Sequence, residues 1–369
     1  MNGKKLLGFV EDPGAANWFV PLAPALRARG YDLDLCGAGT ALAYLAERET
    51  PVRDADGASI MQSISEGSYA ALLVGTAENP DTLGHRLVDT ARACTLPSIG
   101  IIDLAVNAAH RFRGNGGRPL EHAPDFLVVP DREAASAFSA LGFAVNRIAT
   151  VGQVHLESIL RSAKSISPMR RAKARQFAAP GIPADRPLWV FVSEVGYAFD
   201  DPHDASGADF SLRGRGNTHY RTAVVLEELI EVMKELDPAP WLVVRLHPKN
   251  KRVEFDLYRS EIQGLSQFGD PVPLIMAADA VVGMTSMLME EAAALGRPTL
   301  SILPRPAERD WLPGLADGKI PVATTREEVR MAVAELARRT PSLATSFDGA
   351  LDNAVSAISA VVSLGELPR

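Results

Sequence analysis

Two neighbouring hydroxyl side chains, Thr285 and Ser286, lie where the sequence changes from a strand pattern to a helix pattern. An apolar run that ends at Gly283 is typical of a buried parallel strand, and the apolar spacing from Met287 to Gly296 predicts a helix. The two hydroxyls are therefore expected at the N-cap and first turn of that helix. Free backbone N–H groups and the helix dipole favour an anion there, and hydroxyls without an adjacent carboxylate suit a phosphate ester better than a metal. The alternative is an ordinary helix cap.

Two further predicted strands end in polar residues that could complete a phosphate site. Ser193 and Glu194 follow one strand, and the other ends in Arg245, His247 and Lys249. Because ligands of open α/β sheets bind beyond the carboxyl ends of the strands, we expect these groups at one edge, near the hydroxyl pair. Basic side chains, a histidine and a helix N-terminus make a credible diphosphate site, in which His247 could donate to a phosphate or leaving-group oxygen. The alternative for His247 is an ordinary turn residue.

Strand-like and helix-like segments alternate through both halves of the chain, with glycines at the ends of the helices. This alternation predicts an α/β fold with two Rossmann-like, doubly wound parallel sheets in domains that face each other across a cleft. The predicted division is an N-terminal domain over 1–160, a basic, proline-punctuated linker over 161–187 and a C-terminal domain over 188–340. A final helix within 341–369 follows, and its packing back onto the N-terminal domain is left open.

The composition is that of a globular protein. The chain has 369 residues, 47% of them hydrophobic and 22% charged, and a net charge of −7, which suits two domains and argues against nucleic acid as the main partner. No apolar stretch reaches the roughly 18 residues of a membrane span, and the N-terminus lacks a signal-peptide pattern, so a cytoplasmic location is expected. Cys36 and Cys94 have neither metal nor redox spacing, and both are expected to be buried. A homodimer is left open.

The second half of the chain carries motifs that resemble those of nucleotide-sugar enzymes. The run GMTSMLMEEA at 283–292 is similar, register for register, to the pattern G-N-S-S-x-x-x-x-E-A, and RLHPK at 245–249 resembles a His-Pro motif that precedes that pattern. The segment GQVHLESI at 152–159 is similar to the one that ends the first domain of these enzymes. The patterns are typical of UDP-N-acetylglucosamine 2-epimerases and related glycosyltransferases with the two-Rossmann GT-B fold. Bacterial sialyltransferases, capsule polymerases and CDP-glycerol phosphotransferases pair similar motifs, so the nucleotide stays open between UDP and the CMP or CDP type.

The resemblance implies a role for each matching residue. Thr285 and Ser286 would hold the phosphates, His247 would contact the diphosphate, and Glu291 would accept hydrogen bonds from the ribose hydroxyls unless it serves as a cap or in a salt bridge. The residues expected to bind the nucleotide and its diphosphate are Ser193, Glu194, Arg245, His247, Lys249, Gly283, Met284, Thr285, Ser286, Met287 and Glu291. No cofactor and no metal are expected, because this fold stabilises the leaving group with a helix dipole and basic side chains.

The first half departs from the epimerase pattern. The turn at 75–78 stands where the epimerases have an acid within G-D-T, and the segment IIDLA at 101–105 stands where they have H-V-E-A-G. An epimerase must remove and return a proton bound to carbon, which requires acids placed on both faces of the sugar. The displaced and shortened acids therefore count against epimerisation.

Carboxylates still follow the predicted strands of the first half. Asp12, presented by a turn that Pro13 and Gly14 tighten, and Asp103 are the candidates for accepting the proton of an attacking hydroxyl, with His247 as the third predicted catalytic residue. The alternatives are an Asx-type turn for Asp12 and a strand-end cap for Asp103. The residues expected to contact the donor or the acceptor are Gly14, Asn107, Arg111, Arg213 and Arg215.

A polar, glycine-rich stretch over 195–220 has no apolar periodicity. A stretch that long within a compact domain is functional or disordered, and Arg213 and Arg215 could close it over a diphosphate. The acids at 200–204 suggest a metal site, but short acid-rich loops usually bind none, so no metal is expected there.

The sequence as a whole predicts a metal-independent, glycosyltransferase-like enzyme. The N-terminal domain would hold an unidentified acceptor, and the C-terminal domain would hold the nucleotide-sugar donor. The alternatives are a nucleotide-sugar 2-epimerase, hydrolysing or not, a CDP-glycerol-type phosphotransferase, and a nucleotide-binding module without catalysis. Turnover of the donor without any acceptor would distinguish an epimerase from a transferase.

Overall fold

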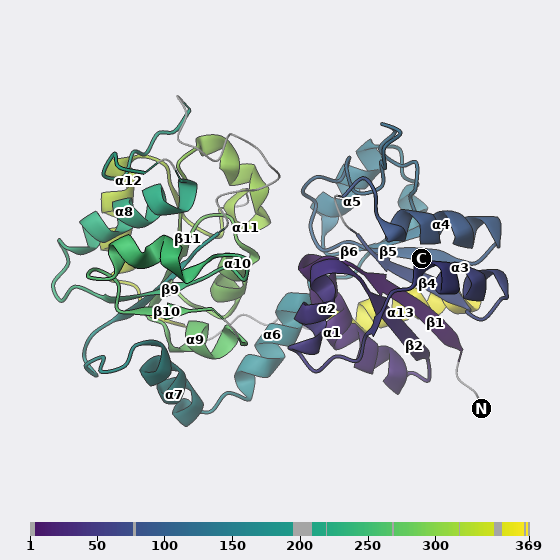
Figure 1. Ribbon diagram of the computed structural model, residues 1–369, viewed down its shortest axis with the longest axis horizontal. Helices are drawn as coiled ribbons and strands as arrows, with labels where there is room; N and C mark the ends of the chain where they lie inside the picture. Colours follow the sequence, from purple (N-terminus) through teal and green to yellow (C-terminus); the bar gives the residue numbers. More distant parts are fainter. Residues whose placement is uncertain are drawn as a thin grey trace. The chain divides into compact units, whose positions relative to one another are not determined.

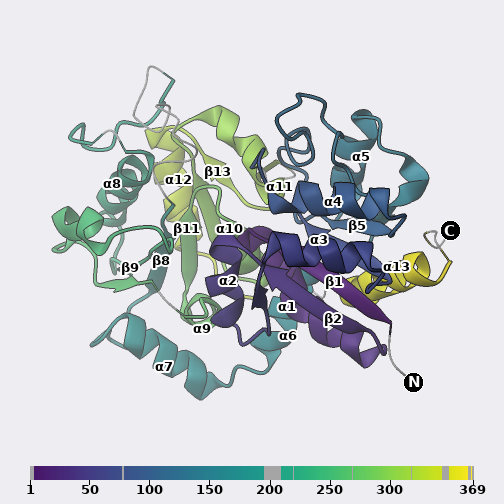
Figure 2. The same cartoon turned by 45° about the vertical axis from the view of Figure 1, so that its right-hand side comes forward.

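The computed structural model describes residues 4–76, 79–194, 209–218, 220–267, 269–316, 318–342, 349–364 and 367. Contacts between Cα atoms divide the chain into two compact units (Figures 1 and 2). The first unit contains Met1–Ser158 and Phe347–Arg369, and the second contains Ile159–Ser346. Each unit has its own parallel sheet, and the two sheets confirm the predicted fold class of two Rossmann-like domains.

The first unit is built on a seven-stranded parallel sheet with the order β3-β2-β1-β4-β5-β6-β7. Its strands are β1 (Lys5–Val10), β2 (Asp32–Gly37), β3 (Arg53–Asp54), β4 (Ala71–Gly75), β5 (Ser98–Ile101), β6 (Phe126–Val129) and β7 (Ile148–Thr150). Its helices are α1 (Pro13–Ala28), α2 (Gly39–Ala46), α3 (Gly57–Ser65), α4 (Leu83–Ala93), α5 (Arg132–Ala140) and α13 (Ala350–Leu364), and α6 (Val154–Lys164) crosses the boundary between the units.

The central strand β1 shows why this sheet needs helices on both faces. Leu6 and Val10 belong to one buried cluster, whereas Leu7 and Phe9 belong to another, because successive side chains of a strand point to opposite faces. The first cluster includes apolar residues of α1 and α13, and the second includes residues of α3 and α4. Helix α13 packs against α1, so the end of the chain completes the core of the first unit (Figure 1).

The second unit contains a six-stranded parallel sheet with the order β10-β9-β8-β11-β12-β13. Its strands are β8 (Leu188–Val192), β9 (Trp241–Arg245), β10 (Gly264–Ser266), β11 (Ala280–Gly283), β12 (Thr299–Ile302) and β13 (Val322–Ala323). Its helices are α7 (Pro168–Ala178), α8 (Arg221–Met233), α9 (Val272–Ala277), α10 (Met287–Ala294), α11 (Pro313–Ala316) and α12 (Arg326–Leu336), with 3-10 helices η3 (Arg252–Tyr258) and η4 (Pro306–Trp311). The strand order reverses beside β8, which places a ligand-binding edge at the carboxyl ends of β8 and its neighbours.

Helix α7 lies within the segment predicted as a linker and packs on α9, where Arg175 donates to Asp279 Oδ2 at 3.1 Å. One local expectation differs from the structure. Cys94 is exposed instead of buried, because it caps the carboxyl end of α4 at the surface, while Cys36 is buried as expected. Within the described part of the chain, no helix combines the length and apolar character needed to cross a membrane.

Candidate functional site

The loop between β11 and α10 has the predicted strand–loop–helix form. Gly283 ends the strand, and a Cβ atom there would lie only 2.7 Å from Met289 Sδ, so a larger residue would require the Met289 side chain to move. Ser286 is the N-cap of α10, and its Oγ accepts a hydrogen bond from the N–H of Leu288 at 3.3 Å. Thr285 lies immediately before the cap. The backbone therefore presents N–H groups and two hydroxyls at the carboxyl end of β11.

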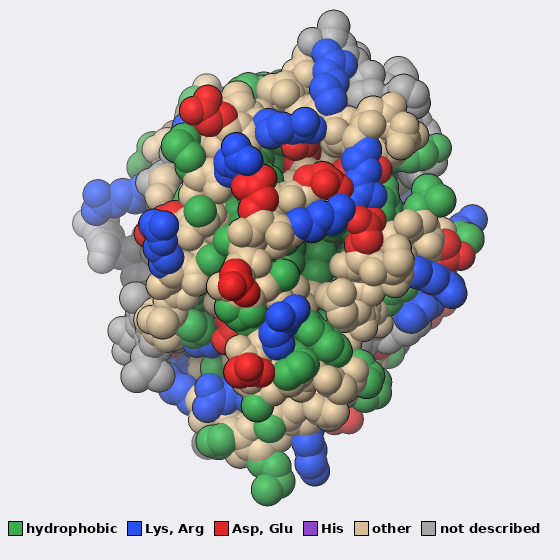
Figure 3. Space-filling view, turned by 90° about the vertical axis from the view of Figure 1, so that its left-hand side faces the viewer, with side chains coloured by type: hydrophobic (Ala, Val, Ile, Leu, Met, Phe, Trp, Pro, Cys, Tyr) green, Lys and Arg blue, Asp and Glu red, His purple; other side chains and the backbone are tan. Residues whose placement is uncertain are grey.

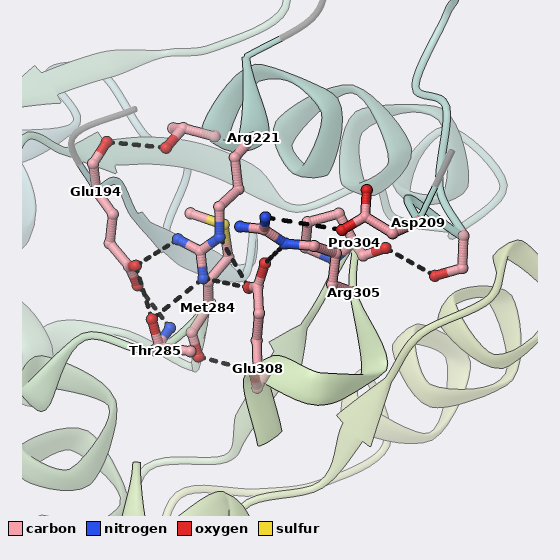
Figure 4. A network of polar contacts seen from close by, with 11 residues as sticks. Glu194, Asp209, Arg221, Met284, Thr285, Pro304, Arg305 and Glu308 are labelled. Atoms are coloured by element: carbon pink, nitrogen blue, oxygen red, sulfur yellow. Dashed lines mark hydrogen bonds and ion pairs between the residues drawn. The ribbon is translucent and has the colours of Figure 1, made fainter. Parts of the chain in front are cut away.

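A carboxylate from the neighbouring strand lies in this loop. The Thr285 N–H donates to Glu194 Oε1 at 2.6 Å, and Thr285 Oγ1 donates to Glu194 Oε2 at 2.9 Å (Figure 4). Because β8 and β11 are paired in the sheet, Glu194 at the end of β8 reaches the loop that follows β11. Glu194 was expected at this edge of the sheet, and the structure directs its carboxylate onto Thr285 itself.

Arg221, the first residue of α8, connects this loop to a second carboxylate. Its Nη1 donates to Glu194 Oε2 at 2.6 Å, its Nη2 donates to Thr285 Oγ1 at 3.1 Å, and its Nε donates to Glu308 Oε2 at 2.8 Å. The side chain is only 4% exposed. Burial alone lowers the pKa of the Arg221 guanidinium, but the charges of Glu194 and Glu308 outweigh that effect and raise the pKa above its usual range. Arg221 is thus a charged, buried cation in contact with the loop through Thr285.

Glu308 anchors the arginine from the opposite side. Its carboxylate is 1% exposed and also accepts from Arg305 Nε at 2.7 Å, so the two guanidiniums share one buried carboxylate (Figure 4). The Trp311 ring lies 5.5 Å from the Arg221 guanidinium. Sequence reasoning missed Arg221, because an arginine at the start of an amphipathic helix has the pattern of a surface residue and nothing local marks it as buried.

His247 lies after β9 and belongs to the same edge of the sheet, since β9 pairs with β8. Its Nδ1 accepts from the Lys249 N–H at 3.1 Å, which leaves the proton of the neutral ring on Nε2 as a donor. Burial lowers the pKa of His247, Lys249 lowers it further, and Glu194 opposes both. Ser193 Oγ accepts from the His247 N–H at 3.1 Å, so Ser193 positions the turn that carries His247.

The other residues predicted for nucleotide binding have varied surroundings. Arg245 directs its guanidinium toward β10, where it donates to Ser266 Oγ at 2.9 Å. The Met284 carbonyl accepts from Ser301 Oγ at 2.7 Å, which fixes the start of the loop. Lys249 is exposed, Met287 begins α10, and Glu291 is buried on α10. These residues lie at or near the edge expected from sequence, and their contacts with a nucleotide stay a prediction.

In the first unit, Asp103 and Gly14 lie close together at the N-terminus of α1. A Cβ atom on Gly14 would collide with the Asp103 carboxylate, so only glycine allows this approach. Asp103 Oδ1 accepts from Arg111 Nη1 at 2.8 Å, and the Arg111 side chain is 5% exposed. Asp12 is the N-cap residue of α1, and Asn107 is exposed with a φ of 58°.

Two further polar residues form hydrogen bonds with Arg111 or Asp103, and sequence reasoning did not select them. Thr76 Oγ1 accepts from Arg111 Nη1 at 2.7 Å, and Gln153 Nε2 donates to the Asp103 carbonyl at 3.0 Å. Both residues follow predicted strands, so the strand-end rule that selected Asp103 could have found them. The acid considered in the turn at 75–78, Glu78, lies outside the described residues.

The two arginines expected to close over a diphosphate differ in their surroundings. Arg215 forms ion pairs with Glu231 and Glu261, both at 2.6 Å, and Glu231 lies ten residues along α8 from Arg221, about 15 Å away. The structure therefore places Arg215 away from the Thr285 loop, within a group of acidic and basic side chains. Figure 3 shows Lys and Arg side chains beside Asp and Glu side chains on one face. Arg213 is exposed, and its N–H donates to Glu228 Oε1 at 3.3 Å.

The stretch at 195–208 lies outside the described residues, and so do the acids at 200–204. Among the residues that are described, no group of three or more His, Cys, Asp or Glu side chains is arranged to hold a metal ion.

No protein-family model matches the sequence, and a comparison with curated protein sequences finds no match. Solved structures give clear similarities. The chain superposes on UDP-GlcNAc 2-epimerase from Neisseria meningitidis bound to UDP-GlcNAc, with a TM-score of 0.66, 13% identity, and 97% of this chain and 99% of that chain covered. UDP-GlcNAc 2-epimerase from Methanocaldococcus jannaschii gives a TM-score of 0.64 at 14% identity, with 95% and 97% covered.

The Anabaena protein HepE in complex with UDP-glucose is also similar, with a TM-score of 0.57, 14% identity, and 97% of this chain and 94% of that chain covered. Identities this low establish the fold and not the reaction. The whole chain therefore has the two-domain, GT-B-like architecture of nucleotide-sugar enzymes, as the sequence motifs implied.

Proposed function

We propose that this protein binds a UDP-sugar through the β11–α10 loop and acts on the sugar of that ligand. The observation that carries the proposal is that the N–H and hydroxyl of Thr285, with Arg221 beside them, already surround an anionic group, the Glu194 carboxylate. A phosphate presents negatively charged oxygens to the same three donors. Proteins of this fold in complex with UDP, UDP-glucose and UDP-GlcNAc support a uridine nucleotide as the ligand.

His247 and Glu291 complete the proposed nucleotide site. In the neutral His247 ring, Nδ1 accepts the Lys249 N–H and Nε2 carries the proton. Nε2 can therefore donate to a diphosphate oxygen or to a leaving-group oxygen. Glu291 lies on α10 after the loop, and a carboxylate can accept from both ribose hydroxyls. Ser286 keeps the helix N-terminus in place as its cap.

Epimerisation of the UDP-sugar itself is the reaction with the best support, ahead of the transfer to an acceptor that the sequence favoured. The fold extends over nearly the whole of several UDP-GlcNAc 2-epimerases. Inversion at a sugar carbon breaks a C–H bond on one face and forms one on the opposite face, so the formula is unchanged, and acid–base groups must accept the first proton and donate the second. Asp12 and Asp103, both at the N-terminus of α1, are the proposed carriers.

Glycosyl transfer is the second candidate, because Asp103 is engaged with Arg111 at 2.8 Å. An aspartate stands where the epimerase pattern has a glutamate, so this carboxylate is one methylene shorter and is also held by a guanidinium. Such a group is better suited to orient a hydroxyl and accept its proton than to reach a proton bound to carbon.

The two reactions are separated by incubating the protein with UDP-GlcNAc alone in D2O and following the sugar by NMR. Epimerisation predicts a second UDP-sugar with deuterium at the inverted carbon, in the absence of an acceptor. Glycosyl transfer predicts no such product, and nucleotide release only after an acceptor is added. Binding is checked first by the thermal shift with UDP, since a ligand at about 100 times its Kd adds about 2.7 kcal/mol of stability. Failure of every uridine nucleotide to bind would refute the proposal.

A further inference from the structure

Glu194 occupies the position at which the proposed function requires a phosphate. Its two carboxylate oxygens take the Thr285 N–H, the Thr285 hydroxyl and one arm of Arg221, at 2.6, 2.9 and 2.6 Å (Figure 4). These are a backbone donor at a helix N-terminus, a hydroxyl and a guanidinium, which together form an anion-binding set. We propose that Glu194 is a built-in competitor of the donor diphosphate, and that Arg221 is the phosphate-binding residue that Glu194 releases. This inference rests on the proposed function.

The donors themselves make the competition unavoidable. Thr285 has one N–H and one hydroxyl proton, and each is already directed at an oxygen of Glu194. A phosphate oxygen can gain these bonds only when the carboxylate gives them up. Two negative charges this close together also repel each other. The sequence-based expectation that Glu194 binds the diphosphate is therefore replaced by the opposite role.

Of the two carboxylates that contact Arg221, Glu194 and Glu308, the surroundings show that Glu194 is the one that leaves the guanidinium. The Glu194 side chain is 15% exposed, whereas the Glu308 side chain is 1% exposed and is shared by Arg221 and Arg305. The backbone of Glu194 is held, since Thr222 Oγ1 donates to its carbonyl at 2.8 Å, so a rotation of the side chain alone would clear the loop. Glu308 meanwhile keeps Arg221 in place.

The charges around Arg221 show how it could bind a phosphate once Glu194 has left. Arg221 and Arg305 carry two positive charges, and Glu194 and Glu308 neutralise them while Glu194 is in the loop. Among the described residues, a further acid, Asp209, is 3.9 Å from Arg305 and largely exposed. Departure of Glu194 frees Nη1 of a buried guanidinium beside Thr285, where it can pair with a phosphate oxygen. A ligand without this negative charge has no means of displacing Glu194, so the device selects for phosphate esters.

The test compares the UDP affinity of the wild type, Glu194→Gln and Glu235→Gln by isothermal titration calorimetry. Glutamine keeps the shape of Glu194 but is a weaker, uncharged competitor, so Glu194→Gln should bind UDP at least tenfold more tightly. Glu235 is the matched control, because it also pairs with an arginine, Arg330, but on the exposed surface just after α8, and its variant should bind as the wild type does.

The outcomes separate this inference from the proposed function. Equal or weaker UDP binding by Glu194→Gln, with clear binding by the wild type, would overturn the inference and leave the function standing. Binding by Glu194→Gln alone would support both. If neither the wild type nor Glu194→Gln binds UDP, both the inference and the proposed function are refuted.

Two further measurements test the displacement of Glu194 and the role of Arg221. In protein with 13C-labelled glutamate carboxyls, the Glu194 resonance is identified by its loss in Glu194→Gln. Saturating UDP should move it to the position of a solvated carboxylate, and an unmoved resonance in the UDP complex would contradict the displacement. In the Glu194→Gln background, Arg221→Lys should then weaken UDP binding at least tenfold, because lysine cannot reach Glu308 and a phosphate at once. Unchanged affinity in a folded double variant would refute the role of Arg221.

Discussion

Single residues at the edge of the second sheet combine structural roles with the proposed binding roles. Ser286 caps α10, and Thr285 next to it supplies the donors that hold Glu194. His247 is held by contacts on its Nδ1 and backbone N–H, which leaves Nε2 as the donor. The same features that stabilise the local backbone therefore set the direction of the groups proposed to meet a diphosphate, and substitutions should affect stability and binding separately.

Replacing Ser286 by alanine should lower the free energy of unfolding by about 1 kcal/mol, because the Leu288 N–H loses its cap. Urea denaturation of the wild type and the variant without ligand measures this loss. UDP should also bind more weakly to the variant, and calorimetry records that effect independently. An unchanged urea midpoint would show that the Ser286 hydroxyl does not cap the helix in solution.

Acid should destabilise the protein partly through His247. Burial and Lys249 hold the pKa of His247 below its ordinary value of 6.5 in the folded chain. The unfolded chain therefore takes up the proton more readily, so the stabilising contribution is present above the unfolded pKa and is lost as the pH falls through the lower, folded pKa. Between about pH 7 and pH 5, His247→Asn should lose less stability than the wild type in urea titrations.

The control for this pH dependence is His110→Asn, because His110 is exposed. The His110→Asn curve should follow that of the wild type throughout. Parallel curves for His247→Asn and the wild type would contradict the lowered pKa of His247.

Elements act here through their neighbours in the sheet more than through their neighbours in sequence. β8, β9 and β11 lie side by side, and their carboxyl ends deliver Glu194, His247 and Thr285 to one edge. In the first unit, α13 is the last helix of the chain, yet it packs on α1, and α1 starts beside Asp103. The packing of α13 thus supports α1, whose N-cap residue is Asp12 and whose first turn lies beside the Asp103 carboxylate.

Ile358→Ala should destabilise the first unit by about 2–5 kcal/mol. Ile358 is fully buried in the cluster that contains the apolar face of α1, so its truncation leaves a cavity between the two helices. Chemical denaturation followed by circular dichroism measures the effect. Ser356→Ala, an exposed position of the same helix, is the control and should change stability by less than about 0.5 kcal/mol. Similar midpoints for the two variants would show that α13 is not part of this core.

For the whole molecule, the repeated sheet order is the main feature. Each unit has its first strand between its second and fourth, β1 in one sheet and β8 in the other, so each has a switch point at the carboxyl ends of its strands. The two edges carry different chemistry. At the edge of the second sheet, Arg221 and Thr285 contact the Glu194 carboxylate. At the edge of the first sheet, Asp12 is the N-cap residue of α1 and the Asp103 carboxylate lies beside Gly14.

Hydrogen exchange should show where the nucleotide binds. Saturating UDP should slow amide exchange in peptides that cover 188–194, 243–250 and 281–292, because these segments form the proposed diphosphate site. Peptides from β2 and β3 lie at the far edge of the first sheet and serve as the control, with exchange expected to be unchanged. Absence of protection in 281–292 with UDP bound would place the nucleotide elsewhere.

The fold class could be predicted from sequence because parallel strands buried on both faces leave continuous apolar runs, and glycines mark the ends of the helices. The same local signals predicted the strand, loop and helix around Ser286. Strand ends carry ligands in this class, so they also directed attention to Asp103, His247 and Thr285. The rule had no means of choosing between a residue that binds a ligand and one that positions its neighbours, such as Thr76 or Ser193.

The sequence by itself thus determined the elements, their order and the hydroxyl pair at a helix N-terminus, because these depend on periodicity and on residues a few positions apart. Only the tertiary structure decided that Glu194 lies in the Thr285 loop, that Arg221 is buried between two carboxylates, and that Arg215 is engaged elsewhere. Each of these pairings joins residues at least 16 positions apart. Their partners are selected by strand order and helix packing, and a charged side chain has no periodic signal in the sequence that announces which opposite charge it will meet.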